Sequence, residues 1–289
     1  MIQLEQEMMS THTTFKIGGP AAYYMIPENE DEIMEALDFA RVRKLPFYLL
    51  GRGSNVLFSD EGYPGVVIEI GRGLERMSVH QEGMVMVQAG IGLSTMAVRL
   101  AEAGLTGFEF AGGIPGTLGG GITMNAGAYG GEIKDCIVSA TVLNEEGNKM
   151  VLSKKELELG YRSSIIQKKK YIVLQGTFSF EKGEREKIFS DMKELNQKRR
   201  EKQPLEYPSA GSTFKRPEGY FAGKLIEDAG LRGYRIGDAQ VSEKHCGFVI
   251  NRGHATAEEV RRLIEEVQNR VREKFQVELE PEVRMVGKF

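Results

Sequence analysis

The sequence has few of the residues that build disulfide frameworks or metal sites. Among its 289 residues only two are cysteine, Cys136 and Cys246, and they lie at neither metal-binding nor redox spacing. We therefore interpret them as small buried thiols in a protein of a reducing compartment. The four histidines match no zinc-binding spacing, so we expect no catalytic metal.

The chain also lacks a long apolar run and a strong charge of either sign. No stretch approaches the roughly 20 apolar residues of a membrane span, and the first residues lack the basic and apolar regions of a secretory signal. A formal net charge of −3 gives little reason to expect nucleic acid as a partner. The composition, 41% hydrophobic and 27% charged, is typical of a soluble globular protein, and we expect a cytoplasmic location.

Glycine, in contrast, is plentiful, and it gathers in the stretch from Gly112 to Gly130. Glycine costs stability inside regular structure, so such a run needs a physical reason. The apolar residues Ile114, Leu118, Ile122 and Met124 argue against a flexible linker. The stretch therefore indicates a packed loop whose amide N–H groups approach a phosphate-bearing ligand.

The apolar pattern of the first part predicts mixed helices and strands. One helix is expected over residues 28–44, and another begins with Ser94 as its N-cap and stops at Gly104. Short apolar runs bounded by Gly and Pro predict strands, including a hairpin that turns near Glu146 and Gly147.

The later part has a different composition. A charge-rich helix over about 182–202 marks a domain boundary. Beyond it we expect a helix around 222–229 and a last helix that begins at Thr256, whose side chain forms a capping box with Glu259. These elements predict a smaller second domain of helices packed on a few strands.

A second glycine motif, GRGSNVLFSD at 51–60, directly follows a predicted strand. It has two glycines of the dinucleotide fingerprint, but the next glycine position is Val56 and the residues after it look extended, which excludes a Rossmann fold. Two interpretations stay open: a turn that binds phosphate through its backbone, Ser54 and Asn55, or a purely structural turn. Two such turns in one domain suggest a pyrophosphate held between them.

Six motifs occur in order along the chain: GRGSN, GIPGTLGGGITMNAGAYGGE, YRSS, GSTFKRP, AGLRGYRIGDAQVSEKHCGFVIN and LEPEVRMVG. From about residue 14 to 287 the chain thereby resembles the UDP-N-acetylenolpyruvoylglucosamine reductase (MurB) family of bacterial cell-wall synthesis. The resemblance implies an α+β fold. Its parts would be an FAD-binding domain of the vanillyl-alcohol-oxidase (PCMH) type at 1–183, with two α+β subdomains split near 70, and a smaller α+β substrate-binding domain at 184–289.

The resemblance also implies an activity, the NADPH-dependent reduction of UDP-N-acetylglucosamine enolpyruvate to UDP-N-acetylmuramate. FAD would be held non-covalently, because neither glycine motif has the histidine to which relatives of the wider flavin fold attach it. The partners would be NADPH and the sugar nucleotide, and the protein a monomer or weak dimer. The tyrosine-bearing insertion of longer family members is missing, so the chain resembles the shorter subtype.

The cofactor-binding residues that the resemblance implies all lie in the two glycine motifs. They are Gly51, Arg52, Gly53, Ser54, Asn55, Gly113, Ile114, Pro115, Gly116, Thr117, Gly119, Gly120, Asn125, Ala126 and Gly127.

The resemblance further implies three catalytic residues. Ser212 would donate a proton, while Arg162 and Glu282 would stabilise the enolate. Arg162 can pair bidentately with the substrate carboxylate, whereas Glu282 would have to be protonated to help directly. Taken singly, all three would be ordinary surface or turn residues. Four further residues are implied to bind substrate: Lys202, Lys215, Tyr234 and His245.

Two other functions stay open. The chain could be a flavin oxidase of the same FAD fold, although no base is evident that would abstract a substrate proton. It could also be a non-catalytic module that binds a nucleotide sugar, although such a module would not need Arg162, Ser212 and Glu282.

Overall fold

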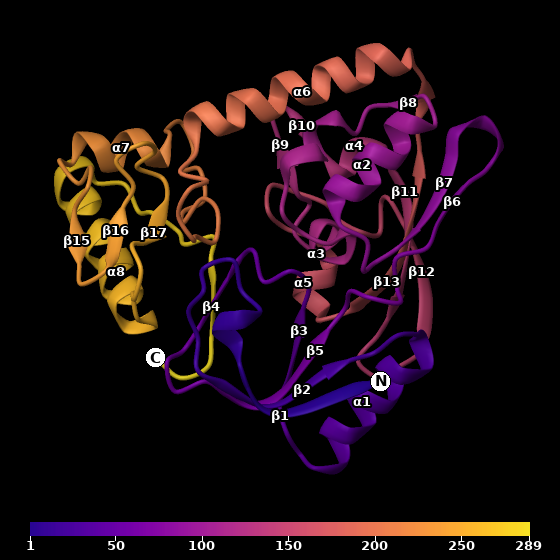
Figure 1. Cartoon of the computed structure of the whole chain (residues 1–289), viewed down its shortest axis with the longest axis horizontal. Helices are drawn as coiled ribbons and strands as arrows, with labels where there is room; N and C mark the ends of the chain where they lie inside the picture. Colours follow the sequence, from indigo (N-terminus) through magenta and orange to yellow (C-terminus); the bar gives the residue numbers. More distant parts are fainter. The chain divides into compact units, whose positions relative to one another are not determined.

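In the computed structural model, which describes residues 1–289, the chain forms two compact units (Figure 1). The first comprises Met1–Gln3, Met25–Arg52 and Val67–Arg199. The second comprises Leu4–Tyr24, Gly53–Val66 and Arg200–Phe289, so that two N-terminal segments fold with the C-terminal part. The division expected from the sequence is different, and it follows the ligand that each part is expected to bind: FAD at 1–183 and the substrate at 184–289. That division stays a prediction.

Helices and strands are interspersed along the whole chain (Figure 1). The helices are η1 (Met9–Thr11), α1 (Glu30–Val42), η2 (Gln81–Gly83), α2 (Leu93–Glu102), η3 (Glu109–Gly113), α3 (Leu118–Thr123), α4 (Ile133–Cys136), α5 (Ile165–Lys169), α6 (Arg185–Lys202), α7 (Ala222–Asp228) and α8 (Ala257–Phe275). The strands are β1 (Ile2–Met8), β2 (Pro20–Ile26), β3 (Phe47–Leu50), β4 (Val56–Phe58), β5 (Tyr63–Glu69), β6 (Met77–Val79), β7 (Met84–Gln88), β8 (Leu105–Thr106), β9 (Gly127–Ala128), β10 (Gly131–Glu132), β11 (Ile137–Leu143), β12 (Lys149–Ser153), β13 (Ile172–Ser179), β14 (Glu181–Lys182), β15 (Arg235–Ile236), β16 (Ala239–Val241), β17 (Val249–Asn251) and β18 (Arg284–Val286).

The largest sheet has five strands in the order β12-β11-β13-β7-β6, and it lies in the first unit. Its neighbouring strands are antiparallel, and β11 and β12 form the hairpin that the sequence predicts, with a turn at Gly147 (φ 84°). A four-stranded sheet has the order β1-β2-β5-β3. In the second unit β15, β16 and β17 form an antiparallel sheet, and β18 pairs in parallel with β4.

Two of the helix ends test the capping predictions of the first unit. Gly104 follows α2 with φ 68°, as predicted. The prediction that Ser94 caps this helix is wrong, because the N-cap is Gly92 and Ser94 lies in the first turn. The reason is tertiary: the N–H of Leu93 donates to Gly116 O at 2.9 Å, so a distant segment receives the first amide of the helix.

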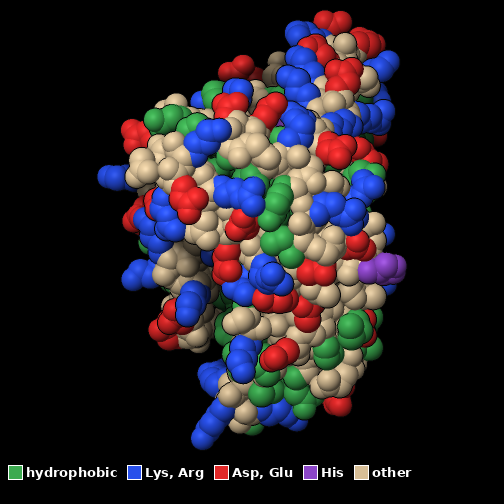
Figure 2. All heavy atoms as spheres, turned by 90° about the vertical axis from the view of Figure 1, so that its left-hand side faces the viewer, with side chains coloured by type: hydrophobic (Ala, Val, Ile, Leu, Met, Phe, Trp, Pro, Cys, Tyr) green, Lys and Arg blue, Asp and Glu red, His purple; other side chains and the backbone are tan.

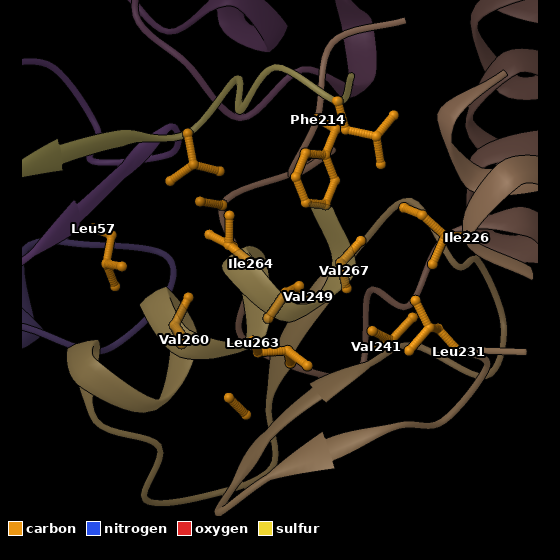
Figure 3. Packing of buried hydrophobic residues seen from close by; sticks show 14 of the residues in the cluster. Leu57, Phe214, Ile226, Leu231, Val241, Val249, Val260, Leu263, Ile264 and Val267 are labelled. Atoms are coloured by element: carbon orange, nitrogen blue, oxygen red, sulfur yellow. The ribbon is translucent and has the colours of Figure 1, made fainter. Parts of the chain in front are cut away.

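The core of the second unit is packed around α8 (Figure 3). Val260, Leu263, Ile264 and Val267 are fully buried on one face of that helix, as its sequence pattern predicts. Each such side chain contributes about 1.5–3 kcal/mol when it leaves water. Leu57 of β4 joins the same cluster, so the strand that follows the GRGSN motif is fixed on this core.

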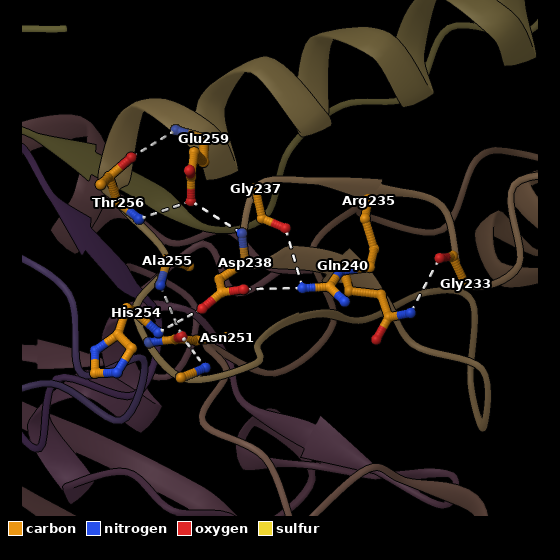
Figure 4. A network of polar contacts seen from close by, with 11 residues as sticks. Gly233, Arg235, Gly237, Asp238, Gln240, Asn251, His254, Ala255, Thr256 and Glu259 are labelled. Atoms are coloured by element: carbon orange, nitrogen blue, oxygen red, sulfur yellow. Dashed lines mark hydrogen bonds and ion pairs between the residues drawn. The ribbon is translucent and has the colours of Figure 1, made fainter.

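Polar contacts fix the start of α8 (Figure 4). The predicted capping box is confirmed, since Glu259 N donates to Thr256 Oγ1 and Thr256 N to Glu259 Oε2, both at 3.1 Å. The Glu259 carboxylate also accepts from Asp238 N at 3.2 Å. Asp238 in turn pairs with Arg235 at 2.8 Å, so the β15–β16 turn is joined to the helix.

Charged side chains of both signs are mixed on the face that Figure 2 shows, with only small apolar areas between them. None of the helices combines the length and the apolar character needed to cross a membrane.

Candidate active site

Two glycines of the first unit lie against side chains with almost no space between them. A Cβ built on Gly51 would lie 2.4 Å from Oγ1 of Thr117, and one built on Gly92 would lie 2.6 Å from Nη2 of Arg52. Real Cβ atoms do not approach other atoms this closely, so either substitution would displace its neighbour. The Thr117 side chain is buried, whereas Arg52 is exposed and can move.

The segment Gly90–Gly92 joins these residues, although it was not among the predicted cofactor residues. Leu93 N donates to Gly116 O at 2.9 Å, and Leu118 N donates to Ile91 O at 2.8 Å. We call the three segments 51–52, 90–92 and 116–120 the glycine cradle. The signal for the missing segment was a third pair of glycines, AGIG, directly after a predicted strand.

Helix α3 begins inside the stretch that the sequence indicated as a loop. Its N-cap is Thr117, whose hydroxyl accepts from Gly120 N, and Gly119 N donates to Ala89 O at 2.8 Å. The amide N–H groups of Gly116 and Thr117 donate to no acceptor in the protein. The cradle therefore offers backbone donors, which suit a phosphate group.

Asn125 fixes the loop that follows α3. It is fully buried in the left-handed region (φ 46°), where asparagine is among the few tolerated side chains. Its Nδ2 donates to Glu132 Oε2 at 2.8 Å and to Gly160 O at 3.0 Å, and its Oδ1 accepts from Lys134 N at 2.9 Å. Both amide hydrogens are therefore used within the protein.

Arg162 lies beside the same loop. Its backbone is left-handed (φ 52°), and its Nη2 donates to Gly127 O at 3.2 Å. The pKa of Glu132 is lowered, chiefly by a hydrogen bond from Lys134 and then by one from Asn125, with a smaller effect of the Arg162 charge. The predicted catalytic arginine thus lies in the same local network as the predicted cofactor residues Asn125 and Gly127.

The second unit holds Ser212 and Glu282 at neighbouring backbone positions. Glu282 N donates to Thr213 O at 2.8 Å, and the flanking residues Phe214 and Pro281 form an antiparallel bridge. Thr213 is buried and is held by Gly247 through a further backbone bond at 2.8 Å. Ser212 itself is exposed, so a buried ladder presents the predicted proton donor to solvent.

Asn55, at the end of the GRGSN motif, lies against the same ladder. Its Nδ2 donates to Glu282 O at 3.2 Å, and its backbone O accepts from Arg284 N at 3.0 Å. A predicted cofactor residue and a predicted catalytic residue are therefore neighbours within this unit. Gly53 is fixed nearby, because a Cβ there would lie 2.1 Å from His12 O and its φ is 59°.

Comparison with known proteins assigns both parts of the chain. The family model described as UDP-N-acetylenolpyruvoylglucosamine reductase, C-terminal domain, matches residues 203–286, and that of an FAD binding domain matches residues 21–153. A UDP-N-acetylenolpyruvoylglucosamine reductase of Lachnoclostridium phytofermentans is 58% identical over 97% of this chain and 92% of its own length. The chain belongs to the UDP-N-acetylenolpyruvoylglucosamine reductase family.

Further relatives agree with this assignment. A UDP-N-acetylenolpyruvoylglucosamine reductase of Caldanaerobacter subterraneus subsp. tengcongensis is 53% identical over 97% of the chain and 92% of the relative. The crystal structure of UDP-N-acetylenolpyruvylglucosamine reductase (MurB) from Thermus caldophilus superposes with a TM-score of 0.84 at 33% identity, covering 99% of this chain and 100% of that one.

Membership of the reductase family confirms several predictions. The resemblance to the family is confirmed, as is the α+β fold with an FAD-binding domain. FAD as the cofactor and an oxidoreductase as the class of enzyme are confirmed too. The individual site residues remain predictions.

Two of the four residues predicted to bind substrate are lysines. Lys202 ends α6 and is exposed. Lys215 forms an ion pair with Glu280 and follows the Phe214–Pro281 bridge. An anionic ligand at Lys215 would therefore have to compete with Glu280.

Tyr234 and His245 are both partly buried. The guanidinium of Arg270 lies 4.5 Å from the centroid of the Tyr234 ring, which itself packs on the core of this unit. His245 Nδ1 accepts from Gly247 N at 3.1 Å, and burial lowers the pKa of its imidazole. The neutral ring therefore carries its proton on Nε2.

No group of three or more His, Cys, Asp and Glu side chains in the structure could hold a metal ion. Cys136 and Cys246 are buried and unpaired, and burial raises the pKa of the Cys136 thiol to about 12.

Proposed function

We propose that this chain reduces UDP-N-acetylglucosamine enolpyruvate to UDP-N-acetylmuramate with NADPH, using non-covalently bound FAD, in the synthesis of peptidoglycan precursors. The observation that supports the proposal is the pairing of Glu282 N with Thr213 O at 2.8 Å, which holds Glu282 beside the residue that follows Ser212, although the two predicted catalytic residues lie far apart in the sequence. Membership of the reductase family supplies the substrate class.

The glycine cradle fits FAD. Its close backbone contacts leave no room for side chains at Gly51, and its amides at Gly116 and Thr117 have no protein acceptor. Phosphate groups take such donors readily, and Arg52 adds a positive charge. We therefore assign FAD binding to the residues predicted from the two glycine motifs, extended by Gly90–Gly92. Bound FAD, once reduced by NADPH, supplies a hydride to the terminal carbon of the enolpyruvyl double bond.

Three residues of the chain handle the charge and the proton. The carbon next to the attacked one becomes negative together with its carboxylate, and Arg162 pairs with that carboxylate through its planar guanidinium. Glu282, in its protonated form, donates a hydrogen bond to the enolate oxygen. The Ser212 hydroxyl then gives its proton to the carbon, which completes the saturated lactyl ether.

The remaining candidates bind the rest of the sugar nucleotide. We assign Lys202 and Lys215 to its phosphates, because compact cations suit phosphate oxygens. His245 offers a neutral Nε2–H donor, since its Nδ1 is used by Gly247. Tyr234 offers its hydroxyl.

We also propose that the protein works in the cytoplasm as a monomer or weak dimer. The sugar nucleotide and NADPH are cytoplasmic metabolites, and no helix could anchor the chain in a membrane. Sedimentation of the purified protein at several concentrations tests the oligomeric state, and a tight higher oligomer would contradict it.

An anaerobic titration tests the activity. The purified protein should be yellow, should bleach with NADPH, and should regain its colour when the enolpyruvyl sugar nucleotide is added. Equimolar UDP-N-acetylmuramate should appear. Flavin-loaded protein whose colour does not return would exclude the reductase, and colour that returns only with oxygen would instead indicate the flavin oxidase. Protein that binds the sugar nucleotide but cannot be loaded with FAD would indicate the binding module.

A further inference from the structure

Arg199 packs on the glycine-rich stretch from the side of α6. Together with Met192 and Asn196 it forms one face of that helix. A Cβ built on Gly113 would lie 2.7 Å from Asn196 Oδ1, 3.0 Å from Arg199 Cδ and 3.3 Å from Arg199 Nη1. Only glycine at 113 leaves room for this arginine, so the loop sequence and the helix side chain fit each other.

The guanidinium of Arg199 has no anionic partner in the protein. No carboxylate lies within ion-pair distance and no acceptor within hydrogen-bond distance. Burial lowers its pKa, opposed only by the nearby Tyr129 hydroxyl. An arginine side chain is seldom removed from water unless protein or ligand acceptors are present, because its five N–H donors would otherwise lose their hydrogen bonds.

The acidic groups around this position are already used. Glu194, on the same helix, pairs with Lys198 at 2.5 Å. Glu132, on the loop beside Arg162, pairs with Lys134 at 2.7 Å and accepts from Asn125. The loop between Gly113 and Tyr129 is thus approached by an arginine whose charge no protein side chain balances.

We propose that Arg199 binds a phosphate group of a nucleotide ligand beside Gly113. The inference rests on the proposed function, which brings three phosphate-bearing ligands to this enzyme: FAD, NADPH and the sugar nucleotide. Guanidinium suits this role because its fork of N–H donors can bind two phosphate oxygens at once. Bound phosphate would supply the hydrogen-bond acceptors that the protein does not provide for the Arg199 guanidinium.

The stability of the apoprotein tests the first half of the inference. Arg199→Met keeps the aliphatic length and removes the charge. If the arginine serves a ligand, the FAD-free variant should melt at the same temperature as the FAD-free wild type or higher, because a partly buried charge without a partner has been removed. A clear fall in melting temperature would show that Arg199 serves the fold, and it would overturn the inference.

Ligand affinity tests the second half and identifies the source of the phosphate. We expect one of three dissociation constants to rise at least about tenfold in Arg199→Met, the loss typical of a charge-assisted hydrogen bond. FAD is titrated into apoprotein by flavin fluorescence. NADPH is measured by the concentration dependence of flavin bleaching, and the sugar nucleotide by its perturbation of the flavin absorbance. Whichever constant rises names the ligand, and three unchanged constants would overturn the inference.

Two further variants make the result specific. Lys193→Met removes an exposed positive charge from the same helix, and it should leave all three constants unchanged. Arg199→Lys keeps the charge without the fork, and it should recover only part of the affinity. Equal losses in Lys193→Met and Arg199→Met would reduce the effect to general electrostatics and overturn the assignment to Arg199.

The two proposals can fail separately. A wild-type protein that binds FAD but never turns over the sugar nucleotide would defeat the proposed function, while the FAD titration of Arg199→Met would still be decisive for this ligand. A wild-type protein with full turnover and an Arg199→Met variant with unchanged affinities would defeat the Arg199 inference alone.

Discussion

The two candidate regions of this molecule are built in opposite ways. In the glycine cradle the backbone itself is the proposed binding surface, and side chains are absent where Gly51 and Gly92 meet their neighbours. In the second unit the backbone around Thr213 and Glu282 is a buried ladder that presents side chains such as Ser212. Substitutions that add atoms should therefore damage the first region, and substitutions that remove side-chain atoms should damage the second.

The largest effect is expected from Ser212→Ala. Loss of a general acid slows its step by about 10²- to 10⁴-fold. Ser212 is exposed and outside the ladder bonds, so the melting temperature should not change. Anaerobic stopped-flow measurements should show normal flavin bleaching by NADPH and slow formation of UDP-N-acetylmuramate.

Thr213→Val provides the matched comparison one residue away. It removes the hydroxyl that accepts from Val249 N at 2.9 Å, in a buried position. This variant should lose about 1–3 kcal/mol of stability, because the buried N–H loses its acceptor, and should keep most of the turnover. If Ser212→Ala turned over as fast as Thr213→Val, the proton role of Ser212 would be refuted.

In the first unit the Asn125 side chain also contributes to stability. The Asn125→Ala variant should show by how much. The change removes three hydrogen bonds and leaves Lys134 N without its acceptor, whereas Glu132 keeps its ion pair with Lys134 and Gly160 O still accepts from Ser163 N. We expect a loss of about 3 kcal/mol, since each of the three hydrogen bonds contributes about 1 kcal/mol. Urea unfolding monitored by circular dichroism measures the loss.

Asn125→Gly separates the side chain from the backbone at this position. Glycine tolerates the left-handed φ of 46° better than alanine does, so the difference between the two variants reports backbone strain. Both should be clearly less stable than wild type. Wild-type stability in Asn125→Gly would mean that the three hydrogen bonds contribute nothing.

In the glycine cradle a single added methyl group should be enough to lower stability and weaken FAD binding. Gly51→Ala places Cβ 2.4 Å from the buried Thr117 hydroxyl, and we expect a loss of about 1–3 kcal/mol together with weaker FAD binding. Gly120→Ala is the control, because its Cβ would meet Thr117 Oγ1 at an ordinary 3.6 Å. Weaker FAD binding in Gly120→Ala, without a loss of stability, would show that the ligand itself occupies the space beside Gly120.

Local signals in the sequence predicted the local structure well. The capping box of α8 depends on Thr256 and Glu259 alone, and the end of α2 on Gly104, so neither needed knowledge of distant residues. Helix α3 was missed because its GGG run has a low intrinsic helix propensity. Glycine is required there for packing, as a Cβ on Gly119 would lie 3.1 Å from that of Ala89.

Tertiary pairings were beyond the sequence pattern. Ser94 has the chemistry of an N-cap, but Gly116 supplies the acceptor one residue earlier, and nothing near Ser94 indicates this. The parallel pairing of β18 with β4 likewise joins segments at opposite ends of the chain. The motifs indicated the predicted site residues of the second unit, but only the fold could show that Asn55 lies against Glu282.

The smallest effect concerns His245, which holds the Ser212 ladder through Gly247. Burial lowers the pKa of its imidazole from the ordinary 6.5, so the unfolded chain binds more protons as the pH falls below that value. Stability should therefore be full above about pH 6.5 and should decline toward the lower folded pKa, where protonated Nδ1 can no longer accept from Gly247 N. His245→Asn offers an acceptor oxygen that does not titrate. Urea unfolding of both proteins between pH 8 and pH 5 should give a steeper decline for the wild type, and parallel curves would show that His245 keeps its ordinary pKa.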